Sequence, residues 1–248
     1  MMTLPKTPSF RLDGKRAFVP GGARGIGFAC AAALAEAGAE VTVAARSADQ
    51  VAEAALALGG NGVVLDVTDH AAVAAFFAQS GPFDILCNSA GLARHSSAMD
   101  TTVADFDAVM DVNVRAAYFL AQQAARGMVG RGGAILQISS QMGHVGGIDR
   151  AVYCASKHAV EGMTKAMAIE WGPERIRVNT LCPTFIRTPL TAATFADPEK
   201  RAWIDSKIKL PRVAEIEDIM GAVVFLASDA SAMVTGTSLL VDGGWTAG

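Results

Sequence analysis

A tyrosine and a lysine four residues apart, Tyr153 and Lys157, are the residues of this chain best suited to proton chemistry. Residues i and i+4 share one face of a helix, so the ammonium group would lie one turn beyond the phenol. An unperturbed tyrosine has a pKa of about 10, which is too high for a base at neutral pH. One lysine charge at ~5 Å, with an effective dielectric constant of ~20, favours the phenolate by about 3.3 kcal/mol. Because that energy would lower the pKa to about 7.5, the pair predicts a phenol that accepts and returns protons.

Two serines precede this pair, just after an apolar run, Ala134–Ile138, that is predicted to be a strand. Ser140 lies thirteen residues before Tyr153, and Ser139 lies beside it. If the strand ends near the tyrosine, a serine hydroxyl there can hold a substrate oxygen on which negative charge develops. The spacing to the tyrosine favours Ser140 for this role, and Ser139 remains the alternative.

A glycine-rich turn lies far upstream, between a predicted strand, Arg16–Val19, and a predicted helix, Ile26–Ala37. Its residues are Gly21, Gly22, Ala23, Arg24, Gly25, Ile26 and Gly27. In such a turn glycines allow a tight bend and a close approach of backbone to a pyrophosphate, and the helix N-terminus offers unpaired N–H groups to phosphates. The alternative is a close-packed turn without a ligand. A dinucleotide that carries hydride beside a phenol that carries protons predicts an alcohol–carbonyl oxidoreductase.

The composition excludes several other classes of protein. The chain has 248 residues, 51% hydrophobic and 18% charged, and a net charge of −3, which gives no basic surface for nucleic acid. No apolar run reaches the ~20 residues that span a bilayer. The first twelve residues hold two prolines and no apolar signal core, so we expect a cytoplasmic protein. We expect reduced, buried thiols and no metal site, because no CxxC pair occurs among Cys30, Cys87, Cys154 and Cys182.

Short apolar runs alternate with alanine-rich helical patterns along the whole chain. The predicted strands are Arg16–Val19, Glu40–Ala44, Gly62–Leu65, Ile85–Asn88, Ala134–Ile138, Arg177–Leu181 and Ser238–Val241. The predicted helices are Ile26–Ala37, Ala48–Leu58, Asp69–Ala78, Val103–Met128, Ala151–Trp171 and Glu215–Ala227. The strands read as buried on both faces. Strict alternation predicts an α/β fold, a Rossmann-type doubly wound parallel sheet of about seven strands with helices on both faces.

No linker divides the chain, so we predict one nucleotide-binding domain over residues 1–248, with an N-terminal tail at 1–11. The segment 188–212, called the lid below, breaks the alternation because it is helix-like but precedes no strand. An insertion after a strand's carboxyl end lies over the ligand crevice of such sheets. We expect its apolar residues to face inward: Leu190, Phe195, Trp203, Ile204, Ile208 and Leu210.

With these motifs in order, the chain resembles the classical short-chain dehydrogenase/reductase family over about residues 10–248. The family's Asn-Asn-Ala-Gly motif has a serine in place of its second asparagine, and it consists here of Asn88, Ser89, Ala90 and Gly91. The resemblance implies that Asn88 braces the central strands. The family's glycine turn usually opens with threonine, where this chain has Pro20. That change removes a hydroxyl and an N–H at the entry of the turn.

The resemblance also implies further cofactor-binding residues. It places Asp66 and Val67 beside an adenine ring. The family's Pro-Gly step after the sixth strand is Pro183-Thr184 here, and a side chain at the second position restricts the backbone near the nicotinamide. The positions that usually meet the carboxamide are Ile186 and Thr188.

The same resemblance gives the catalytic residues their roles. Tyr153 would take the alcohol proton in oxidation and donate it in reduction, while Lys157 would lower the phenol pKa and bind ribose hydroxyls. Ser140 would hold the substrate oxygen. Asn113, within the long helical pattern, would help to hold a water that links Lys157 to solvent.

The choice of nicotinamide coenzyme depends on the end of the second predicted strand. An NAD-preferring site places an acid there for the ribose hydroxyls, but this chain has Ala45 followed by Arg46. Arg24 lies in the glycine turn on the same side. Two guanidiniums without a carboxylate suit the 2′-phosphate of NADP(H), because arginine binds phosphate through a planar fork. We therefore expect NADP(H) to be favoured over NAD(H), and two solvated surface arginines are the alternative.

Other residues near these motifs could edge a substrate pocket. Three that follow the serine or the proline step are Gln141, His144 and Phe185. Further candidates in neighbouring loops are Arg94, His95 and Arg150. The polar ones indicate a hydroxylated or anionic substrate, such as a sugar, polyol or hydroxy acid. The alternative for each is an ordinary loop residue.

The sequence thus predicts an enzyme that interconverts a secondary alcohol and a ketone. A first alternative is a 3-oxoacyl-[acyl-carrier-protein] reductase, for which Arg126 and Arg131 are candidate contacts to an acidic partner. A second is a non-catalytic NAD(P)-sensing regulator, which the intact set of polar residues disfavours. We expect a homo-oligomer, and the family resemblance implies a tetramer.

Overall fold

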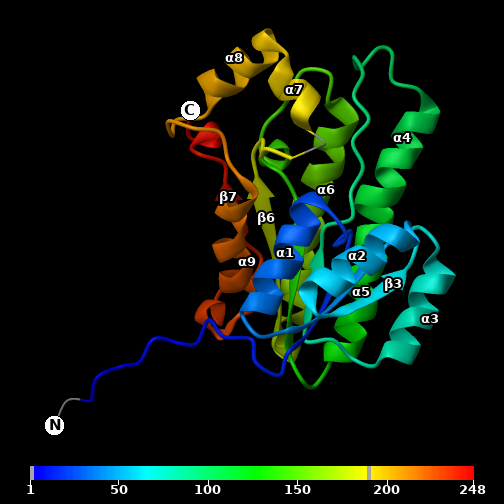
Figure 1. Ribbon diagram of the computed structural model, residues 1–248, viewed down its shortest axis with the longest axis vertical. Coiled ribbons are helices and arrows are strands. Elements are labelled where there is room, and N and C mark those ends of the chain that lie inside the picture. The colour runs from blue at the N-terminus through cyan, green and yellow to red at the C-terminus, as the bar shows by residue number, and fades with distance from the viewer. Residues whose placement is uncertain (1–2, 189–190) are drawn as a thin grey trace.

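A single parallel sheet of seven strands, in the order β3-β2-β1-β4-β5-β6-β7, forms the centre of the molecule. The computed structural model describes residues 3–188 and 191–248 (Figure 1). The strands are β1 Arg16–Pro20, β2 Glu40–Ala45, β3 Asn61–Val64, β4 Ile85–Asn88, β5 Gly133–Ile138, β6 Ile176–Pro183 and β7 Ser238–Val241. The predicted doubly wound fold is confirmed, and every predicted strand is found within two residues of its expected ends.

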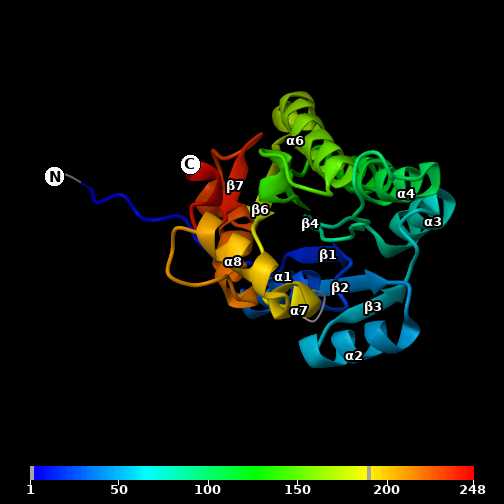
Figure 2. The ribbon, with the colours of Figure 1, turned by 90° about the horizontal axis from the view of Figure 1, so that it is seen from above.

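Helices connect the strands and lie on both sides of the sheet. The α-helices are α1 Gly25–Glu36, α2 Ala48–Leu58, α3 His70–Ser80, α4 Val103–Met110, α5 Ala117–Met128, α6 Ala151–Trp171, α7 Ala192–Ala196, α8 Pro198–Lys207 and α9 Met220–Ala227. Figure 2 shows α4 and α6 on one side of the sheet and α1 and α2 on the other. None of the helices in the described part of the chain has the length and apolar character that crossing a membrane requires.

The long helix predicted over Val103–Met128 contains a break in its hydrogen-bonding pattern. A π-helical segment, η1 Asp111–Ala116, separates α4 from α5. Asn113 lies in this segment and is buried. Widened turns of this kind are rare and occur often at functional sites. The sequence pattern missed the break because it leaves the apolar periodicity intact.

Burial of the strands differs between the centre and the edges of the sheet. All four residues of β4 are buried, and only the first residue of β1 is not. In contrast, β3 has three exposed residues and one half-buried residue. In β7, the other edge strand, no residue is fully buried. The prediction that every strand is buried on both faces is therefore wrong for β3 and β7, because an edge strand has one neighbour and incomplete helical cover.

Two apolar clusters, one on each face, hold the helices to the sheet. Leu34 of α1 and Leu226 of α9 pack with one face of the central strands. On the other face, Phe18 stacks on Phe83, with 5.2 Å between ring centroids, and packs with the buried Leu120 of α5. Because both faces are covered, the sheet forms a rigid base for its loops.

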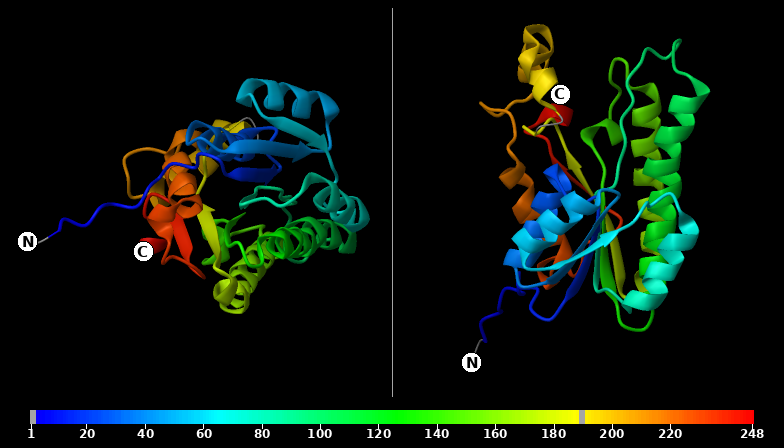
Figure 3. Two further views of the ribbon diagram at one scale, coloured as in Figure 1. Left: turned by 90° about the horizontal axis from the view of Figure 1, so that it is seen from below. Right: turned by 45° about the vertical axis from the view of Figure 1, so that its right-hand side comes forward.

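The parallel sheet brings the loops that follow four of its strands to one edge. The order reverses between β1 and β4, and ligands of such sheets bind outside the carboxyl ends at that reversal. Figure 3 shows the lid helices α7 and α8 above this edge, at the end opposite the N-terminal segment. The fold therefore places the glycine turn, the serines and the lid around one crevice.

Candidate active site

The tyrosine and the lysine lie on α6 as the spacing predicts. The ammonium nitrogen of Lys157 lies 5.7 Å from the centre of the Tyr153 ring. The lysine is 5% exposed, and its Nζ donates a hydrogen bond of 2.9 Å to the carbonyl of Ile138, at the end of β5. A buried charge needs such a partner. This hydrogen bond fixes α6 against the strand that carries the serines.

Burial changes the acidity of the lysine. It lowers the pKa of Lys157 from 10.5 to about 8, and the nearby Cys182 and Glu161 oppose that change. At neutral pH most of the ammonium groups still carry their proton. The Lys157 side chain is therefore positively charged at neutral pH, but it loses its proton more easily than an exposed lysine does.

Burial also raises the pKa of the Tyr153 phenol above 10, and this is its largest cause. A hydrogen bond with Ser140 and the charge of Arg150 act in the opposite direction. The prediction that the lysine and an oxidised coenzyme together make the phenol easy to ionise stays a prediction. A calculation from charges alone omits the cost of removing the phenolate from water.

Of the two serines, Ser140 lies on the tyrosine side. Its Oγ accepts a hydrogen bond of 3.1 Å from the backbone N–H of Met142 and donates one of 2.7 Å to Gln141 Oε1. These contacts orient the hydroxyl, which acts to lower the pKa of the Tyr153 phenol. Ser139 lies instead on the side of Cys182, where its hydroxyl favours the thiolate. The geometry thus favours Ser140 over Ser139.

Asn113 is held by the loop that follows β4. Its Oδ1 accepts from the N–H of Leu92 at 2.7 Å, and its Nδ2 donates to the Leu92 carbonyl at 2.9 Å and to Ser156 Oγ at 3.0 Å. A methyl group built on Gly91 would lie 3.6 Å from Asn113 Oδ1 and 4.0 Å from Lys157 Nζ. The asparagine is therefore beside the lysine, but its side chain already bonds protein groups. A water relay through it stays a prediction.

The glycine turn has the shape that a pyrophosphate requires. Gly21 has a φ of +77°, and a Cβ there would meet the backbone of Ser89 and Ala90 at 2.7 Å. A Cβ on Gly27 would lie 2.0 Å from the Gly21 carbonyl oxygen. Gly25 also has a positive φ, of +53°, but a Cβ there would meet no atom within 4 Å. The turn is thus closed on the protein side and open on the crevice side.

The first turn of α1 leaves its N–H groups available. Arg24 is the N-cap residue and makes no side-chain capping bond, and no acidic residue lies in the first turn. Ile26 lies in that turn. Uncapped N–H groups with the partial positive charge of a helix terminus form an anion site. These residues fit a dinucleotide phosphate.

The motif after β4 braces the strands as predicted. Asn88 is buried, and its Nδ2 donates to Gln137 Oε1 on β5 at 2.8 Å. Its Oδ1 accepts from the N–H of Ala90 at 3.2 Å. The pairing of β1 with β2 continues past Pro20, because the next residue, Gly21, donates to the Ala44 carbonyl at 2.8 Å. The serine in this motif does not disturb the brace.

The predicted adenine side contains both a charge and an apolar residue. Asp66 accepts hydrogen bonds from the N–H and hydroxyl of Thr68, which lower its pKa, and the charge of Arg46 adds to that effect. Val67 is half-buried against the apolar cluster of that face. Arg24 and Arg46 are exposed and form no salt bridge within the described ranges. Both guanidiniums are thus available to a phosphate.

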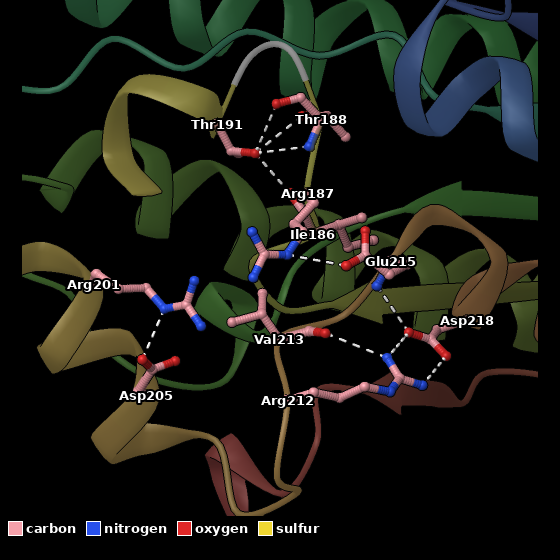
Figure 4. Close-up of polar contacts among 10 residues, drawn as sticks. All are labelled: Ile186, Arg187, Thr188, Thr191, Arg201, Asp205, Arg212, Val213, Glu215 and Asp218. Atoms are coloured by element: carbon pink, nitrogen blue, oxygen red, sulfur yellow. Dashed lines mark hydrogen bonds and ion pairs between the residues drawn. The ribbon is translucent and has the colours of Figure 1, made fainter. Parts of the chain in front are cut away.

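The segment after β6 leads into the lid. The strand runs through Pro183, and Ile186 forms an isolated bridge with Ala214. Thr191 Oγ1 donates to the Ile186 carbonyl at 2.6 Å and accepts from the N–H of Thr188 at 3.0 Å (Figure 4). The backbone near the predicted carboxamide positions is therefore held from within the lid.

Ion pairs fasten both ends of the lid. Figure 4 shows Arg187 against Glu215, at 3.0 Å, and Arg212 in a two-pronged contact with Asp218. The hydrogen bonds from Arg212 lower the pKa of Asp218 to about 2. Both ends of the lid are thus tied to the segment that precedes α9.

The prediction of an apolar inner lid face is correct for Ile204 and Ile208, which are buried with Met142, Cys154 and Trp245. Phe195 and Trp203 are partly buried against the same cluster. Leu210 is 62% exposed, so the prediction is wrong there, because the chain turns outward beyond α8. Leu190 lies outside the described residues.

The three predicted substrate residues separate into different environments. Gln141 is buried and holds Ser140. His144 faces Glu161, with 3.8 Å between Nε2 and Oε2. Phe185 packs against Trp245, with 5.5 Å between ring centroids. Of the three, Phe185 packs on the apolar cluster that Tyr153 also contacts.

Sequence reasoning missed a buried carboxylate one helical turn beyond the lysine. Glu161 is 5% exposed and accepts hydrogen bonds from Thr180 at 2.8 Å, from Cys182 at 3.3 Å and from Ser238. In the described chain, His144, Glu161 and Cys182 bring potential metal-ligand atoms within 4.8 Å of one another. Burial and Glu161 raise the pKa of Cys182 to about 12, so the thiol acts here as a donor. The i+4 spacing from Lys157 was the signal for this residue.

Comparison with known proteins decides the family. A family model described as enoyl-(acyl carrier protein) reductase matches residues 21–246. A solved short chain dehydrogenase/reductase family protein is 39% identical, with a TM-score of 0.89, over 95% of this chain and 99% of that chain. The chain belongs to the short-chain dehydrogenase/reductase family. It is therefore an oxidoreductase.

Two further members of the short-chain dehydrogenase/reductase family are similar over almost their whole length. A D-erythrulose reductase of Gallus gallus is 39% identical over 241 residues, which are 96% of this chain and 98% of that protein. A gluconate 5-dehydrogenase of Burkholderia cenocepacia J2315, solved with NADP and tartrate, is 36% identical. Its TM-score is 0.93, over 96% of this chain and 98% of that chain.

The two glycines of the turn provide a test of the dinucleotide site. We expect Gly27→Ala to lower the melting temperature strongly, because its Cβ would collide with the Gly21 carbonyl. We expect Gly25→Ala to cost only about 1–2 kcal/mol of backbone strain, but to weaken coenzyme binding because its methyl group enters the crevice. Thermal unfolding with and without NADP⁺ separates the two effects. Unchanged coenzyme stabilisation in a folded Gly25→Ala variant would contradict this assignment.

Proposed function

We propose that this protein interconverts a secondary alcohol and a ketone on a small polyhydroxylated molecule, with a nicotinamide dinucleotide as the hydride carrier. The observation that carries the proposal is the position of Tyr153 beside Lys157, whose ammonium group bonds the carboxyl end of β5, the strand that Ser140 follows. The named relatives support it, because one reduces erythrulose and another is a gluconate 5-dehydrogenase.

The coenzyme would lie across the reversal between β1 and β4. Its pyrophosphate fits the N-terminus of α1 at Gly25, Ile26 and Gly27. On the adenine side the predicted contacts are Arg24, Arg46, Asp66 and Val67. On the nicotinamide side they are Asn88, Ala90, Gly91, Pro183, Ile186 and Thr188. When bound, the nicotinamide supplies hydride transfer and, in its oxidised form, a positive charge near the phenol.

The protein's own groups would handle the proton. In this proposal the Tyr153 oxygen takes the alcohol proton during oxidation and returns it during reduction, and Ser140 holds the substrate oxygen through its hydroxyl. The charge of Lys157 favours the phenolate once substrate and coenzyme exclude water. Asn113 fixes the loop after β4 beside the lysine. In this proposal all four side chains act in the same crevice.

The alternative of a 3-oxoacyl-[acyl-carrier-protein] reductase is supported by a single observation. The matching family model is described as an enoyl-(acyl carrier protein) reductase. A carrier protein is acidic and would need free basic residues, but Arg131 is paired with Asp84 at 3.1 Å. The named relatives favour a small substrate. The alternative of a non-catalytic regulator has no supporting observation, since the named relatives are reductases and dehydrogenases.

The assembly and location of the protein remain predictions. We propose a homotetramer through the faces of α4–α5 and α6, where Val103, Phe106 and Ile169 are exposed. We also keep the prediction of a cytoplasmic enzyme.

The central test removes one oxygen atom. Tyr153→Phe keeps the ring contacts with Lys157 and His95, so we expect normal folding and coenzyme binding. We expect kcat to fall about 10²- to 10⁴-fold, the usual contribution of a positioned acid–base group. Initial rates on a panel of ketoses, polyols and sugar acids measure this. Tyr118→Phe, at the second and exposed tyrosine, is the matched control, and near-normal rates for Tyr153→Phe would refute the role.

The lowered lysine pKa predicts a pH dependence. Below pH 8 the Lys157 side chain is mainly charged and above it mainly neutral, since its pKa is about 8. If it binds the coenzyme ribose, NADPH affinity should fall several-fold between pH 7 and pH 9.5. Fluorescence titration measures that affinity, and Lys157→Met should bind weakly at every pH. An affinity that is equal at both pH values would exclude this role for the ammonium.

The arginine pair predicts the coenzyme preference. We expect a lower KM for NADP⁺ than for NAD⁺, because Arg46 can contact a 2′-phosphate. Arg46→Asp should lower kcat/KM with NADP⁺ and raise it with NAD⁺. Arg126→Asp, which makes the same charge change on α5, should leave the ratio unchanged. A wild-type preference for NAD⁺ would show that the two arginines are ordinary surface residues.

A further inference from the structure

Arg150, three residues before the catalytic tyrosine, lies at the edge of the pocket. Its guanidinium carbon lies 5.2 Å from the centre of the Phe185 ring, and its NH1 lies 2.8 Å from His95 Nε2. The His95 ring meets the Tyr153 ring edge-on, with 5.9 Å between centroids. These four side chains come from three separate segments. Together they border the space beside the phenol.

The guanidinium of Arg150 has no carboxylate partner within 4.0 Å in the described ranges. Two other arginines near the crevice are paired: Arg94 with Asp105 at 2.6 Å, and Arg187 with Glu215 at 3.0 Å. Asp149, the adjacent acid, acts on Arg150 only as a weak, more distant charge. Arg150 thus keeps a positive charge that no carboxylate of the described chain neutralises.

The histidine contact does not neutralise that charge. Burial and the charge of Arg150 lower the pKa of His95, so at neutral pH the imidazole is uncharged and its Nε2 accepts the hydrogen bond. Burial also lowers the pKa of Arg150, which reflects the cost of holding the charge there. Arginine nevertheless stays protonated at any physiological pH. A partly buried guanidinium without a carboxylate partner is stabilised most by binding an anion.

The ring of Phe185 holds the guanidinium plane in place. Stacking on an aromatic face orients the remaining N–H groups before a ligand arrives. A planar fork of N–H groups matches a carboxylate in a two-pronged contact. A phosphate ester carries up to two charges, whereas Arg150 supplies a single positive charge. The chemistry therefore favours a carboxylate.

We propose that Arg150 binds a carboxylate of the substrate, so that the preferred substrates are hydroxy acids and keto acids of the sugar-acid class rather than neutral polyols. This inference rests on the proposed function, because it places the carboxylate on the same molecule that Tyr153 oxidises or reduces. The position of Arg150 on the tyrosine side of the pocket puts the carboxylate a few carbons from the reacting carbon.

Matched substrates that differ only in charge test the proposal. D-Gluconate and D-glucitol share a six-carbon polyhydroxylated chain, and threonate and threitol share a four-carbon one. We expect the wild-type enzyme to have a higher kcat/KM for the acid of each pair. Arg150→Gln should lower the acid-to-polyol ratio about 10- to 100-fold, mainly through KM, as expected for loss of a charge-assisted contact. Arg150→Lys should retain part of the preference.

Arg201→Gln is the control, because that arginine is already paired with Asp205 at 2.7 Å. It should leave the ratio unchanged. The carboxylate site would be overturned if the wild-type enzyme had equal kcat/KM values for the polyol and the acid of each pair. It would also be overturned if Arg150→Gln left the acid-to-polyol ratio of kcat/KM unchanged. Either result would leave the proposed oxidoreductase function intact. Highest activity on a phosphorylated sugar, lost in Arg150→Gln, would also overturn it in favour of a phosphate site.

A binding measurement keeps the test independent of turnover. With NADP⁺ present, gluconate should raise the melting temperature of the wild type more than glucitol does, and Arg150→Gln should abolish that difference. Equal stabilisation by the two compounds, or an unchanged difference in the variant, would refute the inference. Absence of turnover on every compound, together with selective stabilisation by gluconate, would refute the proposed reaction and support the carboxylate site.

Discussion

The hydrogen bond from the Lys157 ammonium to the Ile138 carbonyl is the contact on which the site depends. A buried charge is stable only where a polar group meets it, and the end of β5 supplies that group. The bond places one turn of α6 against the last residue of the strand. Ser140 follows two residues later in the chain, and Tyr153 lies one turn earlier on the helix. A single buried charge thus holds the helix that carries Tyr153 against the strand that Ser140 follows.

Burial acts on the two titrating groups in opposite ways. It lowers the pKa of the lysine to about 8 and raises that of the phenol, because both changes favour the uncharged form. The hydrogen bond of Ser140 and the charge of Arg150 work against the second change. The same dry surroundings strengthen every charge–charge interaction within the crevice. Several groups therefore set the pKa of the phenol, and no single neighbour accounts for it.

The arginines around the crevice differ in whether a carboxylate neutralises their charge. Arg187 and Arg212 are paired with carboxylates and fasten the lid to the segment that precedes α9. Arg150 is held by a ring and a neutral imidazole, which orient it without cancelling its charge. The glycine turn also has a packed part and a free part: backbone atoms fill the space where a Gly27 side chain would lie, and no atom fills that space at Gly25. Rigid, satisfied contacts thus surround two places where a ligand's negative groups fit.

The sequence by itself predicted the parallel sheet, the order of its elements and the residues of the glycine turn and the Tyr153–Lys157 pair. These follow from local rules: apolar periodicity, glycine at bends, and i+4 spacing on a helix. Only the tertiary structure revealed that Asn113 lies in a π-helical segment, that Glu161 is a buried carboxylate, and that Arg150 lacks a partner. Hydrogen bonding, burial and pairing join residues that are distant in the chain, such as Arg150 and His95, and local spacing carries no information about them.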